Sequence, residues 1–148
     1  MIVRFFAVRA DDLSEPKGSH PMEFSNPQGV VAPASHYSQL VTIPANARRA
    51  IASGQIGIAP DGSVCEGLEA QTVQAFENLF KVIEGAGMTK NDIVKIVFYS
   101  TVPGSVASFR EIRDRMFDGH APACTYLEIS ALATPDFLCE VEGEAVAL

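Results

Sequence analysis

The fold of this chain is constrained most by a long amphipathic segment, residues 68–85, and by the nearly uninterrupted apolar run that follows it, residues 93–100. In the first segment large apolar side chains recur at spacings of three or four, which predicts a helix with one buried face. They are Val73, Phe76, Leu79, Phe80 and Ile83. The second segment lacks the alternation of a half-exposed strand, so it predicts a strand covered on both faces. A helix packed on a sheet is therefore the minimum architecture.

The other predicted elements complete an α+β chain. A second helix is expected over residues 105–117, with Val106, Phe109, Ile112 and Met116 facing inward. Further strands are expected at residues 1–8, 40–43, 49–58, 125–131 and 138–146. Residues 11–33 are expected to form a loop or extended arm, and Asn46-Ala47 to turn a hairpin between two of the strands. Pro60-Asp61-Gly62 is a stronger turn signal. The order β-β-β-α-β-α-β-β predicts two helices on one face of a mixed sheet.

Composition narrows the possible partners. The 148 residues carry a net charge of −7 and no cluster of Lys and Arg, which disfavours binding to nucleic acid. No apolar run approaches the roughly 20 residues that span a bilayer, so a membrane protein is not expected. Three cysteines without zinc-finger spacing indicate a cytoplasmic chain with free thiols and no metal site. With 47% hydrophobic and only 20% charged residues, so small a domain is expected to bury surface against other subunits.

The last predicted strand carries alternating glutamates. Glu140, Glu142 and Glu144 point to the same side of such a strand, about 7 Å apart. One interpretation is a solvated sheet face. The other is a cleft in which one carboxylate has a raised pKa and transfers protons. Periodicity alone leaves both open.

Six short segments, in order along the chain, resemble motifs of the RidA/YjgF family. They are SGQI at residues 53–56, EAQT at 69–72, NL at 78–79, EGAGM at 84–88, DIVK at 92–95 and EAVA at 144–147. The resemblance covers residues 26 to 147. It divides the chain into an N-terminal strand and extended arm, residues 1–25, and a RidA-like domain, residues 26–148.

The resemblance implies a chorismate-mutase-like fold and a homotrimer with a central barrel and small-molecule clefts between subunits. The best-known activity of the family is hydrolysis of reactive imines and enamines to 2-oxo acids and ammonia, without metal or cofactor. Carried over to this sequence, Tyr37 matches the tyrosine of the early loop and Glu144 the glutamate that positions water. Gly54 lies on the cleft-lining strand.

Two departures from the family pattern affect the predicted site. Where the family has an arginine that binds the substrate carboxylate, this chain has Cys124, followed by Thr125 and by Tyr126 at a position that is often cysteine. A neutral thiol cannot form the paired, charge-assisted hydrogen bonds of a guanidinium. Arg110, at a position where the family commonly has asparagine, is one candidate for the missing charge. The alternative is a solvent-facing arginine paired with an acidic neighbour.

Cys124 has two interpretations. As a nucleophile it needs a nearby base, and His36 is the candidate. As a packing residue it fills the space of the lost arginine. His36, a loop histidine, is also a candidate for contact with the ligand. From the resemblance we expect a hydrolase that acts on a small imine, enamine or related metabolite through water positioned by Glu144. Because Cys124 replaces the family arginine, we expect the substrate to be non-standard or to be bound differently. The alternative is a trimer of the same fold that binds a metabolite or partner without catalysis.

Overall fold

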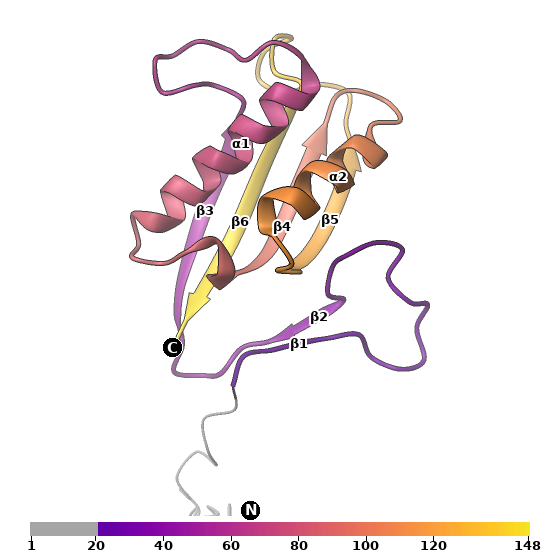
Figure 1. Ribbon diagram of the computed structural model, residues 1–148, viewed down its shortest axis with the longest axis vertical. Helices are drawn as coiled ribbons and strands as arrows, with labels where there is room; N and C mark the ends of the chain where they lie inside the picture. The colour runs from indigo at the N-terminus through magenta and orange to yellow at the C-terminus, as the bar shows by residue number, and fades with distance from the viewer. Residues whose placement is uncertain (1–20) are drawn as a thin grey trace, which may run out of the picture.

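The computed structural model describes residues 21–148 (Figure 1). The strand predicted over residues 1–8 lies outside this range. The elements, in order, are β1 (Glu23–Ser25), β2 (Leu40–Thr42), β3 (Arg48–Ile56), α1 (Gly67–Glu84), the 3₁₀ turn η2 (Lys90–Asp92), β4 (Ile93–Ser100), α2 (Val106–Phe117), β5 (Ala123–Glu128) and β6 (Cys139–Ala147). None of the helices within the described part of the chain is long and apolar enough to cross a membrane.

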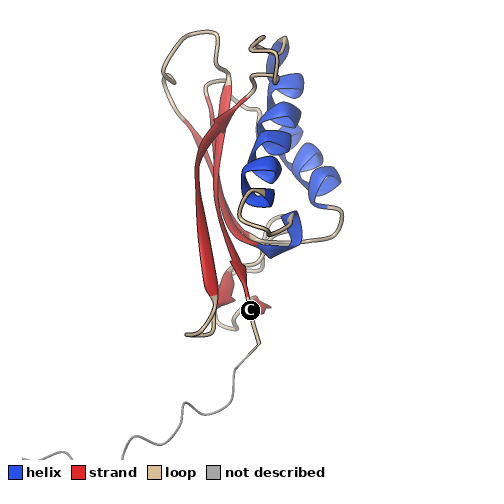
Figure 2. Ribbon diagram, turned by 90° about the vertical axis from the view of Figure 1, so that its left-hand side faces the viewer, coloured by secondary structure: helices blue, strands red, loops and turns tan. Residues whose placement is uncertain are grey.

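Four strands form a mixed sheet in the order β3-β6-β4-β5. β6 is antiparallel to both of its neighbours, whereas β4 and β5 are parallel because α2 carries the chain back between them. Both helices lie on one face of this sheet (Figure 2). The predicted α+β fold, with two helices on one face of a mixed sheet, is confirmed.

Near the N-terminus one prediction is incomplete and another is wrong. The segment expected to be a loop or arm contains β1, which pairs antiparallel with β2 in a separate ribbon. The expected hairpin at Asn46-Ala47 does not form, because β3 pairs with β6 rather than with β2. A turn is present, with the amide of Ala47 3.2 Å from the carbonyl oxygen of Pro44. The nine-residue β3 finds a partner of its own length in β6, which the three-residue β2 cannot offer.

An aromatic cluster fixes α2 on the sheet. The ring of Phe76, on α1, lies 6.1 Å from that of Phe98 on β4 and 6.4 Å from that of Phe109 on α2. Phe98 and Phe109 are closer still, at 4.5 Å between centroids, and Tyr126 of β5 lies 5.2 Å from Phe109. Such ring pairs each add about 0.5–1.5 kcal/mol beyond the burial of their surface. The first turns of α2 are therefore held directly above β4 and β5.

The opposite face of the sheet has no layer over it within residues 21–148. Ile51 of β3 is 77% exposed there, and Leu127 of β5 also belongs to the exposed apolar residues. The predicted glutamate alternation is present on this face: Glu140, Glu142 and Glu144 are half-buried, while the residues between them are buried beneath the helices. An oligomer that covers this face remains a prediction.

Candidate functional site

A pocket of about 170 Å³ lies between α2, β5 and the loop that precedes β2. We call it the α2–β5 pocket; its lining residues are Ser35, Tyr37, Val106, Phe109, Arg110, Arg113, Cys124 and Tyr126. Four of the predicted site residues meet here, from three separate segments of the chain. They are Tyr37, Arg110, Cys124 and Tyr126.

Strand alternation and one anchored loop bring these residues together. Cys124 and Tyr126 both pack towards the core beneath the helices. Their neighbour Thr125 is exposed and points to the other side, as alternation requires. Ser38 ties the loop to the start of β5: its hydroxyl donates to the carbonyl oxygen of Ala121 at 2.7 Å, and its backbone bridges to that of Ala123. This bridge holds Tyr37 at the pocket.

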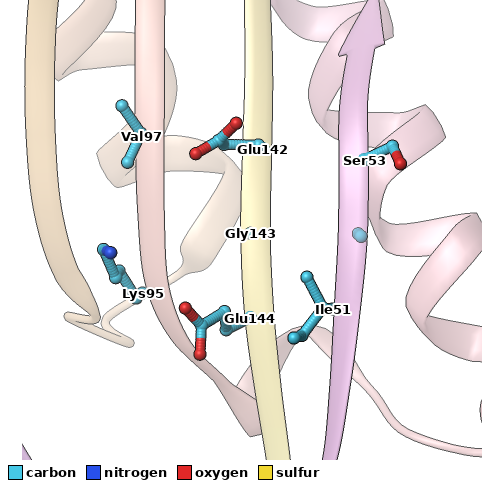
Figure 3. Close-up of a pocket in the computed structure, with 8 residues that line it drawn as sticks. Ile51, Ser53, Lys95, Val97, Glu142, Gly143 and Glu144 are labelled. Carbon is cyan, nitrogen blue, oxygen red and sulfur yellow. The ribbon is translucent and has the colours of Figure 1, made fainter.

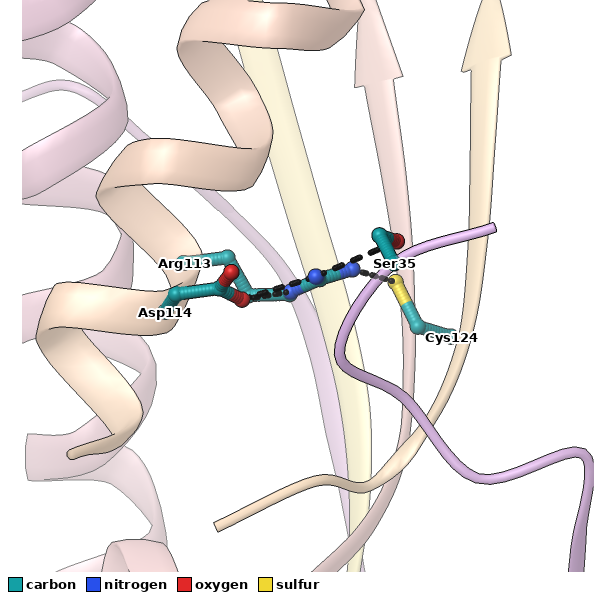
Figure 4. A network of polar contacts seen from close by, with 4 residues as sticks. All are labelled: Ser35, Arg113, Asp114 and Cys124. Atoms are coloured by element: carbon teal, nitrogen blue, oxygen red, sulfur yellow. Dashed lines mark hydrogen bonds and ion pairs between the residues drawn. The ribbon is translucent and has the colours of Figure 1, made fainter. Parts of the chain in front are cut away.

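Arg113 is the residue of the pocket that the sequence analysis missed. Its side chain is only 3% exposed. Nε and Nη2 donate to one carboxylate oxygen of Asp114, at 2.9 and 2.7 Å, while Nη1 lies 3.7 Å from Sγ of Cys124 (Figure 4). The signal was its spacing: Arg113 continues the inward series of Val106 and Phe109 by one further turn, so a charged side chain falls on the apolar face.

Within residues 21–148, no histidine lines the pocket beside Cys124. His36, the predicted base, is exposed and is not among the residues that line the pocket. Burial raises the pKa of the Cys124 thiol, and the Arg113 and Arg110 guanidinium groups only partly offset this. The thiol is therefore the dominant form at neutral pH, which fits a packing residue better than a nucleophile.

Tyr126 forms the polar end of the pocket wall. Its hydroxyl shares a 2.8 Å hydrogen bond with that of Ser105 and donates to a carboxylate oxygen of Glu128 at 3.0 Å. Burial raises the pKa of the Tyr126 phenol. Because the same Glu128 oxygen also accepts from the amide of Gly104 at 2.8 Å, the loop before α2 and the ring of Tyr126 are held in one arrangement.

Glu144 lies on the other face of the sheet, away from the α2–β5 pocket. Together with Ile51, Lys95 and Glu142 it lines a second hollow, of about 190 Å³, over β3, β6 and β4 (Figure 3). Its carboxylate forms an ion pair with Arg49. Thr125 also belongs to this face. Within one chain, then, the sheet separates Glu144 from Cys124.

Gly54 stands at an irregularity in the pairing of β3 with β6, between Ala52 and Gln55. A Cβ at this position would lie 1.6 Å from a carboxylate oxygen of Glu140. The Glu140 side chain folds across the backbone here, so any residue larger than glycine would displace it. Over residues 21–148 no three His, Cys, Asp or Glu side chains gather in a way that would hold a metal ion.

Comparisons with known proteins agree on one family. The family model described as Endoribonuclease L-PSP matches residues 28–147. A 2-iminobutanoate/2-iminopropanoate deaminase of Salmonella typhimurium is 33% identical over 100 residues, 65% of this chain and 77% of the relative. The crystal structure of YyfB, a Rid-family protein of unknown function from Yersinia pestis, matches with a TM-score of 0.77 and 26% identity, over 86% of this chain and 100% of that one. Escherichia coli TdcF, solved with bound serine, gives a TM-score of 0.64 and 25% identity, over 85% and 99% of the two chains. This chain, with its sheet, its two helices and its loop tyrosine at the α2–β5 pocket, belongs to the RidA/YjgF family.

Proposed function

We propose that the protein is a hydrolase that converts a small imine or enamine into a carbonyl compound and ammonia. The observation that carries the proposal is the convergence of Tyr37, Cys124 and Tyr126 with two arginines in one small pocket. These three positions correspond to family site positions, and a relative named as an imine deaminase shares a third of its residues with this chain over their common length.

The reaction needs a positioned water and one group that carries a proton. Water adds to the carbon of the C=N bond while one of its protons is removed, and the nitrogen is protonated. The resulting carbinolamine then passes its hydroxyl proton to the amino nitrogen, so that the C–N bond breaks, the C=O bond forms and ammonia leaves. In this proposal Glu144 accepts the proton from water and returns it to the nitrogen, and Tyr37 orients the substrate by its hydroxyl. A carboxylate and a phenol are sufficient for both tasks.

The position of Glu144 adds a requirement. Because the sheet lies between Glu144 and the α2–β5 pocket of the same chain, the carboxylate at a given pocket has to come from another copy. This argument supports an oligomer with its sites between subunits, and the family resemblance implies that this oligomer is a homotrimer. The exposed apolar side chains of the open sheet face, Ile51 above all, support the same assembly.

A second candidate is binding of a small metabolite without turnover. It is favoured by one feature: within the described chain, no Asp or Glu lines the α2–β5 pocket. If no second copy brings Glu144 to it, the pocket has binding groups but no base.

A coupled assay distinguishes the two candidates. An amino-acid oxidase generates 2-imino acids from several amino acids in turn, and the release of 2-oxo acid and ammonia is followed with and without the protein. We expect acceleration for at least one short-chain amino acid, its loss in Glu144→Gln and a marked reduction in Tyr37→Ala. Glu77→Gln, on the exposed side of α1, is the matched control and should behave as the wild type. Absence of acceleration for every amino acid tested would overturn the proposal for 2-imino acids, the substrates that this assay supplies.

A further inference from the structure

We propose that Arg113, on α2, binds the carboxylate of the ligand in place of the strand arginine whose position Cys124 occupies. The ligand class that follows from the pocket is a small carboxylate with a short apolar part, and the proposed function makes it a 2-oxo or 2-imino acid. The inference rests on the proposed function only for the reaction; the binding itself can be tested without turnover.

The first argument is the incomplete pairing of a buried guanidinium. Of its five N–H groups, the two that meet an anion both go to Asp114. The other printed contacts are long and neutral: Ser35 Oγ at 3.4 Å from Nη2, and Cys124 Sγ at 3.7 Å from Nη1. A buried cation is stable when it is paired and hydrogen-bonded. An anion bound to the edge formed by Nη1 and Nη2 would therefore be a better partner for the guanidinium than the neutral groups that the protein supplies there.

The second argument is the local balance of charge. Asp114 offsets one positive charge. Its side chain is 42% exposed, however, whereas the side chain of Arg113 is almost fully buried. Arg110 brings a second guanidinium to the same pocket, and it takes part in none of the ion pairs formed within residues 21–148. Both arginines act on the thiol of Cys124, lowering its pKa against the effect of burial. The floor of the pocket is thus positive.

The third argument is shape. Cys124 is short, so the space that a strand arginine would fill is open to a side chain that enters from the helix above (Figure 4). The guanidinium carbon of Arg113 lies 5.4 Å from the ring centroid of Phe109, which restrains the orientation of the charged group. Pockets for drug-sized ligands measure about 300–1,000 Å³. A pocket of about 170 Å³ accepts a ligand of a few heavy atoms, with its apolar part against Val106 and Phe109.

Calorimetric titration with 2-oxobutanoate, the stable 2-oxo counterpart of an imino acid, tests the inference directly. The wild type is expected to bind this anion and to bind its methyl ester at least tenfold more weakly. Arg113→Gln, which removes the charge at similar length, should weaken binding of the anion tenfold or more, or about 1.4 kcal/mol at the least. Arg113→Lys, which keeps the charge but loses the planar fork, should fall between the two. Arg115 is an exposed arginine of the same helix and lies outside the pocket, so Arg115→Ala is the control and should bind as the wild type does.

Three results would overturn the inference: a wild type that does not bind 2-oxobutanoate, equal binding of acid and methyl ester, or a folded Arg113→Gln protein with unchanged affinity. Binding without any imine hydrolysis would leave the inference standing and reject the proposed function. Hydrolysis that survives in Arg113→Gln with an unchanged KM would reject the inference and leave the proposed function standing.

A second measurement covers the case in which the Arg113 variants fail to fold. In a Cys65→Ser background, alkylation of Cys124 is followed by peptide mass spectrometry. Because Nη1 of Arg113 faces Sγ of Cys124, an anion bound to this edge shields the thiol. Saturating 2-oxobutanoate should slow the alkylation at least threefold, and the methyl ester at equal concentration should not. Equal rates with and without the acid would contradict the inference.

Discussion

The separation of Tyr37 and Glu144 by the sheet makes a quantitative prediction about mixed oligomers. Tyr37 lines the α2–β5 pocket on the helix side, and Glu144 lies on the opposite face. A site that uses both must take them from two copies. A Tyr37→Ala copy keeps its glutamate and a Glu144→Gln copy keeps its tyrosine, so the two impaired proteins restore each other only at sites that they share.

The recovered activity follows from the number of subunits in the ring. In a cyclic trimer each subunit places Tyr37 in its own pocket and Glu144 in the pocket of one neighbour, so each of the three sites combines two subunits. Any trimer that contains both variants, in either two-to-one composition, has one complete site of three, so we expect about a third of the wild-type kcat. A mixed two-fold dimer would have one complete site of two and give about half.

The assay uses co-expression of the two variants with different affinity tags. Purification on both tags leaves only mixed oligomers, and 2-oxo acid release is measured per subunit in the oxidase-coupled reaction. Wild type carrying both tags sets the full value, and each variant carrying both tags sets the background. Activity in the mixed oligomer no higher than this background would falsify the shared-site argument. A Glu144→Gln protein that retains full activity by itself would remove Glu144 from the mechanism altogether.

Three further predictions concern single positions. Gln71 is buried, donates to the carbonyl oxygens of Cys65 and Asp136 at 3.1 and 2.9 Å and accepts from the amide of Leu138 at 2.8 Å. Each of these three hydrogen bonds contributes roughly 1 kcal/mol, so Gln71→Leu should lower the free energy of unfolding by about 3 kcal/mol. Urea titrations at equal protein concentration measure this loss, and a loss below about 1 kcal/mol would contradict the role of Gln71. Gly54→Ala should cost about 1–3 kcal/mol, because its Cβ displaces the Glu140 carboxylate, and the double variant Gly54→Ala/Glu140→Ala should recover most of the loss. Arg113→Gln removes a cation that lowers the pKa of Cys124, so the pH midpoint of Cys124 alkylation should move upward, whereas Arg115→Ala should leave it in place. A downward shift would contradict this effect of Arg113 on the thiol.

Periodicity predicted the elements that are long and have one buried face. α1 lies within one residue of the expected segment, and β4 matches its predicted bounds, since Phe76 and Ile96 can be buried only in one arrangement. The glutamate alternation of β6 was also readable, because a strand of nine residues gives the pattern several repeats. The pairing partners were not readable. β3 joins β6, which is far away in the sequence, and no local pattern near Asn46 indicates that choice.

The site was only partly predictable for the same reason. The resemblance gave Tyr37, Cys124 and Tyr126, which do line one pocket. It did not indicate that Cys124 and Glu144 face opposite sides, because that depends on the register between β5, β4 and β6 rather than on either strand alone. Arg113 lies one turn beyond Arg110, and the family pattern marks only the position of Arg110, so the resemblance did not indicate Arg113.

The alternation along β5 has a consequence for how such a protein can change over evolution. Within this six-residue strand, Cys124 and Tyr126 shape the pocket, while Thr125 and Leu127 shape the opposite surface. Substitutions at the first pair act on ligand choice, and substitutions at the second act on whatever meets the open face of the sheet. Substitutions at neighbouring positions can therefore change ligand preference while the surface behind the pocket stays constant.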